Sequence, residues 1–232
     1  MAFKTDAILF LPALLCDSRL YKSMINHFAD SVEVSVADTL SDNNLRAMAE
    51  RAIHSMPERC ALVGNSMGGY LALEIAARAP GRVSHLALIG TNSHADDAGV
   101  RTKREQAIRL AERGKFSSFV DGYVESALSF SNRAEHAPLM REMARDLGAD
   151  TLVAQQRAIM DRKSYEDDLS SIKVPSLVMV GREDGLADTA HQQTMAKRLP
   201  NCRYMEVPKC GHLVPLEAPE ILNSALTTLF SA

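Results

Sequence analysis

The chain has 232 residues, of which 46% are hydrophobic, and it carries a formal net charge of -3 with an isoelectric point near 6.2. This length suits one large α/β domain and is too short for two domains of ordinary size. The small net charge gives no electrostatic reason to expect binding to nucleic acid or to an anionic membrane. We therefore expect a small-molecule substrate as the partner. The composition does not indicate whether the chain forms oligomers.

The start of the chain and its cysteines give expectations about the compartment. Residues 1–6 lack the charged and then apolar layout of a signal peptide, and no apolar run reaches the ~18 residues that a membrane span requires. The four cysteines are scattered and form no CxxC pair, which argues against a zinc site or a disulfide framework: Cys16, Cys60, Cys202 and Cys210. Free thiols suit a reducing compartment, so we expect a cytoplasmic protein.

Strand and helix patterns alternate through the first 92 residues. Apolar or alternating stretches predict strands at residues 7–11, 32–36, 60–63 and 83–90. Helical spacing predicts helices at residues 19–28, from Ser41 or Asp42 to about residue 56, and from the third strand to residue 79. This β-α-β-α-β-α-β order is typical of a parallel sheet covered by helices on both faces, in which ligands bind at the carboxyl ends of the strands.

The segment of residues 93–168 has a different character. It is rich in Arg, Glu, Ala and Met, and its helical patterns fall at residues 100–112, 115–130, 137–147 and 150–162. We interpret it as a helical cap, inserted between strands of a core made of residues 1–92 and 169–232. The alternative is a set of solvated helices packed on the side of the core.

The sheet pattern returns after this insertion. Strands are predicted at residues 174–181 and 203–207, and helices from Asp188 or Thr189 to residue 199 and over residues 215–230. The whole chain therefore predicts an α/β fold with about six parallel strands.

A Gly-x-Ser-x-Gly pentapeptide, Gly64 to Gly68, lies between an apolar strand and a helix rich in Ala and Leu. A serine on such a sharp turn is exposed above the end of the sheet, and glycines are required where a side chain would collide with neighbouring backbone. The helix that follows directs its amide groups and its dipole toward the serine oxygen, which favours an oxyanion. Ser66 is therefore the candidate nucleophile; the alternative is a serine that only caps the helix.

A serine hydroxyl needs a base, and the base needs a carboxylate that orients it. Asp184 follows the penultimate strand, and His212 follows the last strand after a short loop, so both are expected at the same edge of the sheet as Ser66. Glu183 and Asp188 are competing acids with a less suitable spacing. Asp184 as a turn cap and His212 as an ordinary loop histidine are the structural alternatives.

Taken together, these motifs resemble the α/β-hydrolase fold family. The matching elements are the Gly64–Gly68 pentapeptide, the Gly-x-x-Asp that ends at Asp184, and the Gly-His pair that ends at His212. The resemblance implies that the backbone amides of Leu14 and Met67 form the oxyanion hole. The family often has His-Gly after its first parallel strand, whereas this chain has Pro12-Ala13, and Ala13 is less free in conformation than glycine.

This resemblance implies a serine hydrolase that cleaves an ester-like bond through an acyl-enzyme on Ser66, without a metal or another cofactor. Carboxylesters are the expected substrate class. Thioesterase activity and carbon-carbon bond hydrolysis use the same three residues and stay open. A ligand-binding receptor without catalysis is the alternative from another functional class, because this fold serves both.

Overall fold

Six strands form one parallel sheet in the computed structural model, which describes residues 3–232. The strands are β1 (Ala7–Leu11), β2 (Glu33–Val36), β3 (Cys60–Asn65), β4 (Val83–Ile89), β5 (Ser176–Gly181) and β6 (Cys202–Val207), in the order β2-β1-β3-β4-β5-β6. The four inner strands are buried along their whole length, as expected for a parallel sheet covered on both faces, whereas the edge strands β2 and β6 are partly exposed. The predicted α/β fold with about six parallel strands is confirmed; the first two residues of the predicted core segment lie outside the described part.

The carboxyl ends of β1 and β3 lie side by side at the point where the strand order reverses. β1 pairs with β2 on one side and with β3 on the other, and Leu11 is in register with Gly64. The connections that leave these two strands therefore run in opposite directions and leave a crevice between them. This is the position at which open α/β sheets bind their ligands.

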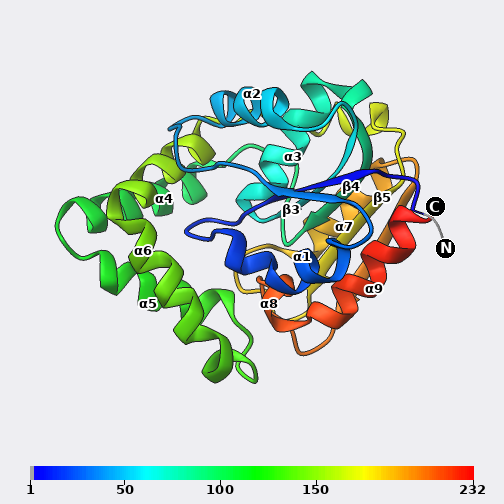
Figure 1. Cartoon of the computed structure of the whole chain (residues 1–232). Helices are drawn as coiled ribbons and strands as arrows, with labels where there is room; N and C mark the ends of the chain where they lie inside the picture. The colour runs from blue at the N-terminus through cyan, green and yellow to red at the C-terminus, as the bar shows by residue number, and fades with distance from the viewer. Residues whose placement is uncertain (1–2) are drawn as a thin grey trace.

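Helices cover both faces of the sheet (Figure 1). Helices α1 (Lys22–Phe28) and α9 (Pro219–Phe230) pack against each other, and α2 (Leu45–Ser55) packs against α3 (Met67–Arg78), which also contacts β1, β3 and β4. The remaining helices of the core are α7 (Thr189–Arg198), α8 (Val214–Glu217) and the 3₁₀ turns Ser18–Tyr21, Pro80–Arg82 and Leu169–Ser171. No helix within residues 3–232 is long and apolar enough to cross a membrane.

Three predicted helices of the core differ from the structure. The helix predicted over residues 19–28 is the 3₁₀ turn Ser18–Tyr21 followed by α1. Helix α2 begins at Leu45 rather than near Ser41 or Asp42, because the side chain of Asn44 caps it by accepting a hydrogen bond from the amide of Ala47 at 2.8 Å. The predicted helix over residues 215–230 is two helices, because Ala218 has a non-helical backbone and Pro219 starts α9.

Three helices lie between β4 and β5 in the chain and form a layer at the carboxyl ends of the strands (green in Figure 1). They are α4 (Ala98–Glu112), α5 (Phe116–Ala127) and α6 (Arg133–Met160), and each packs against the other two. Helix α6 contains both of the last two helical patterns of this segment. Gly148 separates its halves with a φ of 81° and a ψ of 175°, a backbone conformation that only glycine adopts readily.

Candidate active site

Ser66 lies on the turn between β3 and α3 in a strained conformation, with a φ of 55° and a ψ of -116°. A Cβ atom on Gly64 would overlap the carbonyl oxygen of Gly68, and a Cβ on Gly68 would overlap the carbonyl oxygen of Leu11. Only glycine fits at these two positions, as the Gly-x-Ser-x-Gly pattern predicts. A non-glycine residue at positive φ costs free energy, so the surrounding structure must hold this turn in place.

Asn65 connects this turn to the loop that carries His212. Its side chain is fully buried, and its Nδ2 donates to the carbonyl oxygens of Ile89 at 3.0 Å and His212 at 3.1 Å. Its own amide donates to the hydroxyl of Tyr21 at 3.0 Å. Nothing in the pentapeptide pattern requires asparagine at this position, so sequence analysis missed its role.

His212 and Asp184 are in direct contact. The Nδ1 atom of His212 lies 2.8 Å from Oδ2 of Asp184, and both side chains are almost completely buried. The other oxygen of Asp184 accepts from the amides of Leu186 at 2.8 Å and Ala187 at 2.9 Å. The turn-cap alternative for Asp184 is therefore compatible with its contact to His212, because each role uses a different carboxylate oxygen.

The competing acids lie elsewhere. Glu183 is exposed, and Asp188 is exposed and caps α7 through a 2.8 Å hydrogen bond from the amide of Ala190. Of the acids considered, Asp184 alone contacts His212 within residues 3–232.

Two backbone amides near Ser66 are free to bind an oxyanion. Within the described chain, neither the amide of Leu14 nor that of Met67 donates to a protein acceptor, and Met67 is the first residue of α3. The positive φ in the loop after β1 falls on Leu15, at 53°, and not on Ala13. The alanine that replaces the usual glycine is thus accommodated without that strain.

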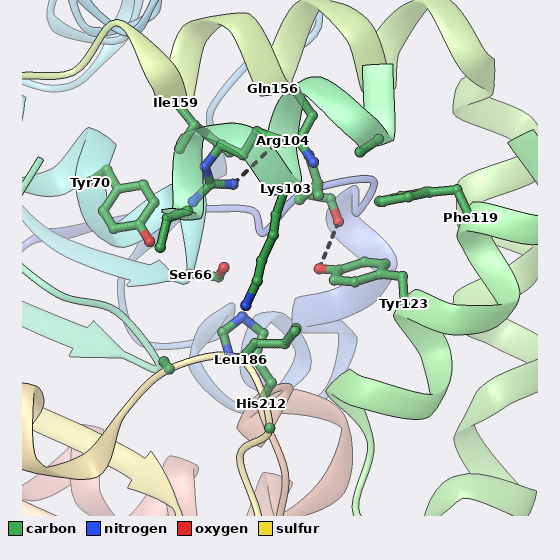
Figure 2. A pocket seen from close by; sticks show the side chains of 15 residues that line it. Ser66, Tyr70, Lys103, Arg104, Phe119, Tyr123, Gln156, Ile159, Leu186 and His212 are labelled. Atoms are coloured by element: carbon green, nitrogen blue, oxygen red, sulfur yellow. Dashed lines mark hydrogen bonds between the residues drawn. The ribbon is translucent and has the colours of Figure 1, made fainter. Parts of the chain in front are cut away.

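Two side chains from the inserted helices hold the loop after β1. Gln155 of α6 is fully buried; its Oε1 accepts from the amide of Leu15 at 2.9 Å, and its Nε2 donates to the carbonyl of Thr39 at 3.3 Å. The hydroxyl of Tyr123 donates to the carbonyl of Leu14 at 3.4 Å (dashed in Figure 2), and burial raises the pKa of this hydroxyl so that it keeps its proton. These helices therefore position the segment that carries the Leu14 amide.

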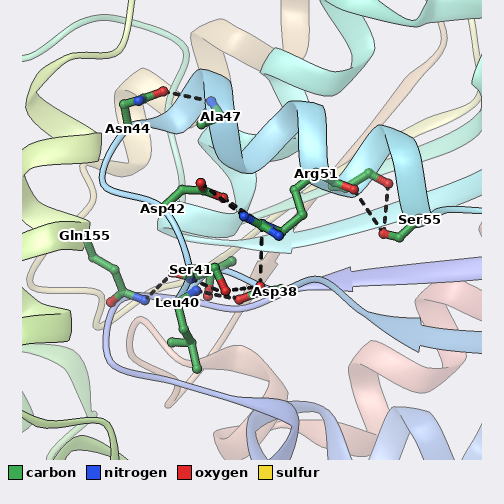
Figure 3. A network of polar contacts seen from close by, with 11 residues as sticks. Asp38, Leu40, Ser41, Asp42, Asn44, Ala47, Arg51, Ser55 and Gln155 are labelled. Carbon is green, nitrogen blue, oxygen red and sulfur yellow. Dashed lines mark hydrogen bonds and ion pairs between the residues drawn. The ribbon is translucent and has the colours of Figure 1, made fainter.

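Hydrogen bonds and an ion pair also hold the loop after β2, which contains the Thr39 carbonyl that Gln155 contacts (Figure 3). The carboxylate of Asp38 accepts hydrogen bonds from the amide of Leu40 and from the hydroxyl of Ser41. Asp42 pairs with Arg51 of α2 at 2.8 Å. The loop after β2 is therefore fixed to the core, and α6 is joined through Gln155 to two loops at the carboxyl edge of the sheet.

A cavity of about 280 Å³ lies between this edge and the inserted helices. Ser66 and His212 line its floor, and Lys103, Arg104, Tyr123 and Gln156 line its helical wall (Figure 2). This volume is just below the ~300–1,000 Å³ typical of ligand pockets, which favours a small substrate. None of these wall residues could be identified from the sequence, because a helical pattern does not indicate which face of the helix meets the cavity.

The hydroxyl of Ser66 makes no hydrogen bond to a group of residues 3–232, including the ring of His212 that lines the same cavity. The described residues contain no cluster of His, Cys, Asp or Glu that could hold a metal ion. Cys16 and Cys210 are buried near the site, and burial raises the pKa of both thiols, so neither is a reactive thiolate.

Comparison with known proteins identifies relatives along most of the chain. The alpha/beta hydrolase family matches residues 26–225. The chain is 27% identical to the protein named "Putative 2-succinyl-6-hydroxy-2,4-cyclohexadiene-1-carboxylate synthase" of Bacillus subtilis, an alignment that covers 96% of this chain and 85% of that one. It is 29% identical to a 2-hydroxymuconate semialdehyde hydrolase of Pseudomonas putida over 68% of this chain and 58% of the relative.

Solved structures show the same fold at lower identity. An esterase from Thermogutta terrifontis superposes with a TM-score of 0.86 at 20% identity and covers 99% of this chain and 92% of its own. An enol-lactonase from Burkholderia xenovorans has a TM-score of 0.87 at 16% identity and covers 98% and 92%.

Proposed function

Because this chain belongs to the alpha/beta hydrolase family and is a hydrolase, we propose that it cleaves an ester-like bond of a small molecule with Ser66 as the nucleophile. The observation that carries the proposal is the 2.8 Å contact between Nδ1 of His212 and Asp184, with His212 and Ser66 lining one cavity. That contact leaves Nε2 as the ring nitrogen available to accept the serine proton.

In the first half of the reaction, Nε2 of His212 takes the proton of the Ser66 hydroxyl while Oγ attacks the carbonyl carbon. The hydrogen bond between these atoms forms in the substrate complex, where such contacts tighten. The carbonyl oxygen becomes an oxyanion, which the amides of Leu14 and Met67 bind at the amino end of α3. The intermediate collapses when the leaving group takes the proton from His212, and an acyl group remains on Ser66.

In the second half, a water molecule gives its proton to Nε2 of His212 and attacks the acyl carbon. The acid leaves as Ser66 recovers its proton. Asp184 keeps the proton of the neutral imidazole on Nδ1 and stabilises the imidazolium that forms in each half. Its two hydrogen bonds from Leu186 and Ala187 fix the carboxylate in that orientation.

Residues 93–168 act as the cap in this proposal, and residues 1–92 and 169–232 act as the core. Contacts across the segments support it: Gln155 and Tyr123 hold the loop after β1, and the amide of His212 donates to the carbonyl of Ala127 at 2.7 Å. The alternative, in which these helices are solvated and pack on the side of the core, does not account for a cavity that both the core and the helices line.

The test is turnover of short-chain 4-nitrophenyl esters and thioesters by the wild-type chain, the Ser66→Ala variant and a matched control. Ser224→Ala is suitable as the control because this exposed serine lies on α9, away from the cavity. We expect Ser66→Ala to abolish turnover and Ser224→Ala to retain it. Full activity of Ser66→Ala would contradict the proposal, and stabilisation by a ligand without turnover of any substrate would support a receptor instead.

A further inference from the structure

The helical wall of the cavity is positively charged. Lys103 and Arg104 are neighbours on α4 and both line the cavity, whereas no aspartate or glutamate occurs among the described lining residues. The carboxylate of Asp184 lies behind His212 and is completely buried. A substrate in this cavity would therefore meet cationic groups that no acidic side chain of the lining neutralises.

Behind this wall, two arginines share one buried carboxylate. Asp96 contacts Nε of Arg104 at 2.5 Å and Nη1 of Arg162 at 2.7 Å, and its side chain is 1% exposed. Arg162 is 2% exposed, stacks on the ring of Tyr70 with its guanidinium carbon 4.1 Å from the centroid, and donates to the carbonyl of Ile159. One carboxylate cannot neutralise two guanidinium groups, so this cluster retains one positive charge next to the cavity.

Arg104 has donors left over for a ligand. Its guanidinium carries five N–H groups. Three of them are used, two by the oxygens of Asp96 and one by Oε1 of Gln156 at 3.0 Å. The remaining two N–H groups have no acceptor among residues 3–232, and Arg104 lines the cavity.

Lys103 is the second donor. It is exposed and forms no ion pair or hydrogen bond through its amino group within the described chain. Figure 2 shows its side chain extending from α4 across the cavity, with the amino group on the side of Ser66 and His212. A cation so placed can bind an anionic group of a substrate whose carbonyl lies at Ser66.

We propose that the substrate of this hydrolase carries a carboxylate, which Lys103 and Arg104 bind while the scissile bond lies at Ser66. This inference rests on the proposed function of Ser66. A singly charged, planar carboxylate matches one ammonium and the two free N–H groups of one guanidinium. The amino end of α4, where a phosphate would otherwise bind, is occupied by the carboxylate of Asp97, which accepts from the amide of Val100 at 2.8 Å.

The first experiment compares pairs of esters of similar shape, of which one member carries a carboxylate and the other does not. On the acyl side, 4-nitrophenyl hydrogen glutarate is paired with 4-nitrophenyl 5-methylhexanoate, in which an isopropyl group replaces the carboxylate. On the leaving-group side, 4-carboxyphenyl acetate is paired with 4-isopropylphenyl acetate. After subtraction of uncatalysed hydrolysis, we expect kcat/KM to favour the anionic ester by at least tenfold in one pair. Equal values, or a preference for the neutral ester, in both pairs would overturn the proposal.

Variants test whether the preference comes from the wall. Lys103→Gln should reduce the ratio of kcat/KM for the anionic ester to kcat/KM for its neutral partner at least fivefold, and Lys103→Glu should bring that ratio below one. Because Lys103 is exposed and makes no ion pair with a described residue, neither variant should disturb folding. The matched control is Lys115→Gln, an exposed lysine of the same helical layer outside the cavity, which should behave as the wild type. An unchanged preference in both Lys103 variants would contradict the assignment.

A binding measurement separates this inference from the proposed function. Glutarate should raise the Tm of the Ser66→Ala variant, the neutral diamide glutaramide should not, and addition of Lys103→Gln should abolish the shift. This result would support the carboxylate site even if no ester is hydrolysed. If neutral esters are hydrolysed but glutarate does not change the Tm, the role of Ser66 is unaffected and the carboxylate site at Lys103 and Arg104 is refuted. A Tm shift with inorganic phosphate but not with glutarate would refute the carboxylate assignment.

Discussion

Replacing Gln155 by methionine is expected to lower both the stability and the turnover of the enzyme. Methionine has a similar volume but can neither accept from the amide of Leu15 nor donate to the carbonyl of Thr39, which Gln155 contacts at 2.9 Å and 3.3 Å. The unpaired, buried amide should cost about 1–3 kcal/mol of the free energy of unfolding. The longer contact to Thr39 adds less.

The effect on catalysis follows from the position of Leu15, next to the amide of Leu14 that we assign to the oxyanion hole. Loss of one oxyanion donor lowers kcat by about 10²–10³-fold, and a displacement of the donor should cost part of that, roughly 10- to 100-fold. The KM should change little, because the oxyanion forms only after the substrate has bound. Gln155→Glu keeps an oxygen for the amide of Leu15 and should recover most of the lost kcat.

Urea unfolding and ester kinetics on the same preparations measure both effects. Thr5→Val is the matched control, because the buried hydroxyl of Thr5 also makes two 2.9 Å contacts, to Ala7 and Ser84, but at the amino ends of the strands. It should lower stability and leave kcat unchanged. If Gln155→Met loses stability but has the same kcat as Thr5→Val, Gln155 does not position the loop that carries the Leu14 amide.

Three further predictions concern the turn that carries Ser66, the carboxylate of Asp184 and the buried His85. Gly68→Ala should prevent folding, because the new Cβ would overlap the carbonyl of Leu11; a soluble variant with a wild-type circular dichroism spectrum and Tm would contradict this. Asp184→Asn should lower kcat by about 10³–10⁴-fold through the wrong imidazole tautomer while leaving Tm nearly unchanged, and a loss below tenfold would count against its role. Burial lowers the pKa of His85 from 6.5 to about 4. Since the unfolded state then binds more protons below pH 6.5, urea unfolding at pH 5 should give a free energy about 1–2 kcal/mol lower than at pH 7 from this group. The free energy of unfolding of His85→Asn should fall correspondingly less between pH 7 and pH 5, and a fall equal to that of the wild type would exclude His85 as the cause.

The sheet, and the position of Ser66, Asp184 and His212 at one edge of it, could be predicted because their signals are local. The Gly64–Gly68 pentapeptide is set by steric overlap within one turn, and a short strand pattern precedes each of Ser66, Asp184 and His212 in the sequence. The predicted start of α2 was wrong because Ser41, Asp42 and Asn44 can all cap a helix. Only the contacts of the folded loop determine which of them does so.

The contacts that hold the site together could not be predicted in the same way. Gln155 meets Leu15 across 140 positions of sequence, and Asn65 meets His212 across 147. The two basic residues of the cavity wall could not be predicted for the same reason. Helix α4 carries several basic residues, and only the packing of α4 on α6 determines which of them face the cavity. A helical pattern indicates that a face exists but not what it faces.

Labelling with a fluorophosphonate, followed by peptide mapping, shows directly whether Ser66 is the nucleophile that His212 activates. We expect one covalent adduct on the peptide that contains Ser66, strongly reduced in His212→Gln and absent in Ser66→Ala. An adduct on another residue, or labelling that persists in Ser66→Ala, would contradict it.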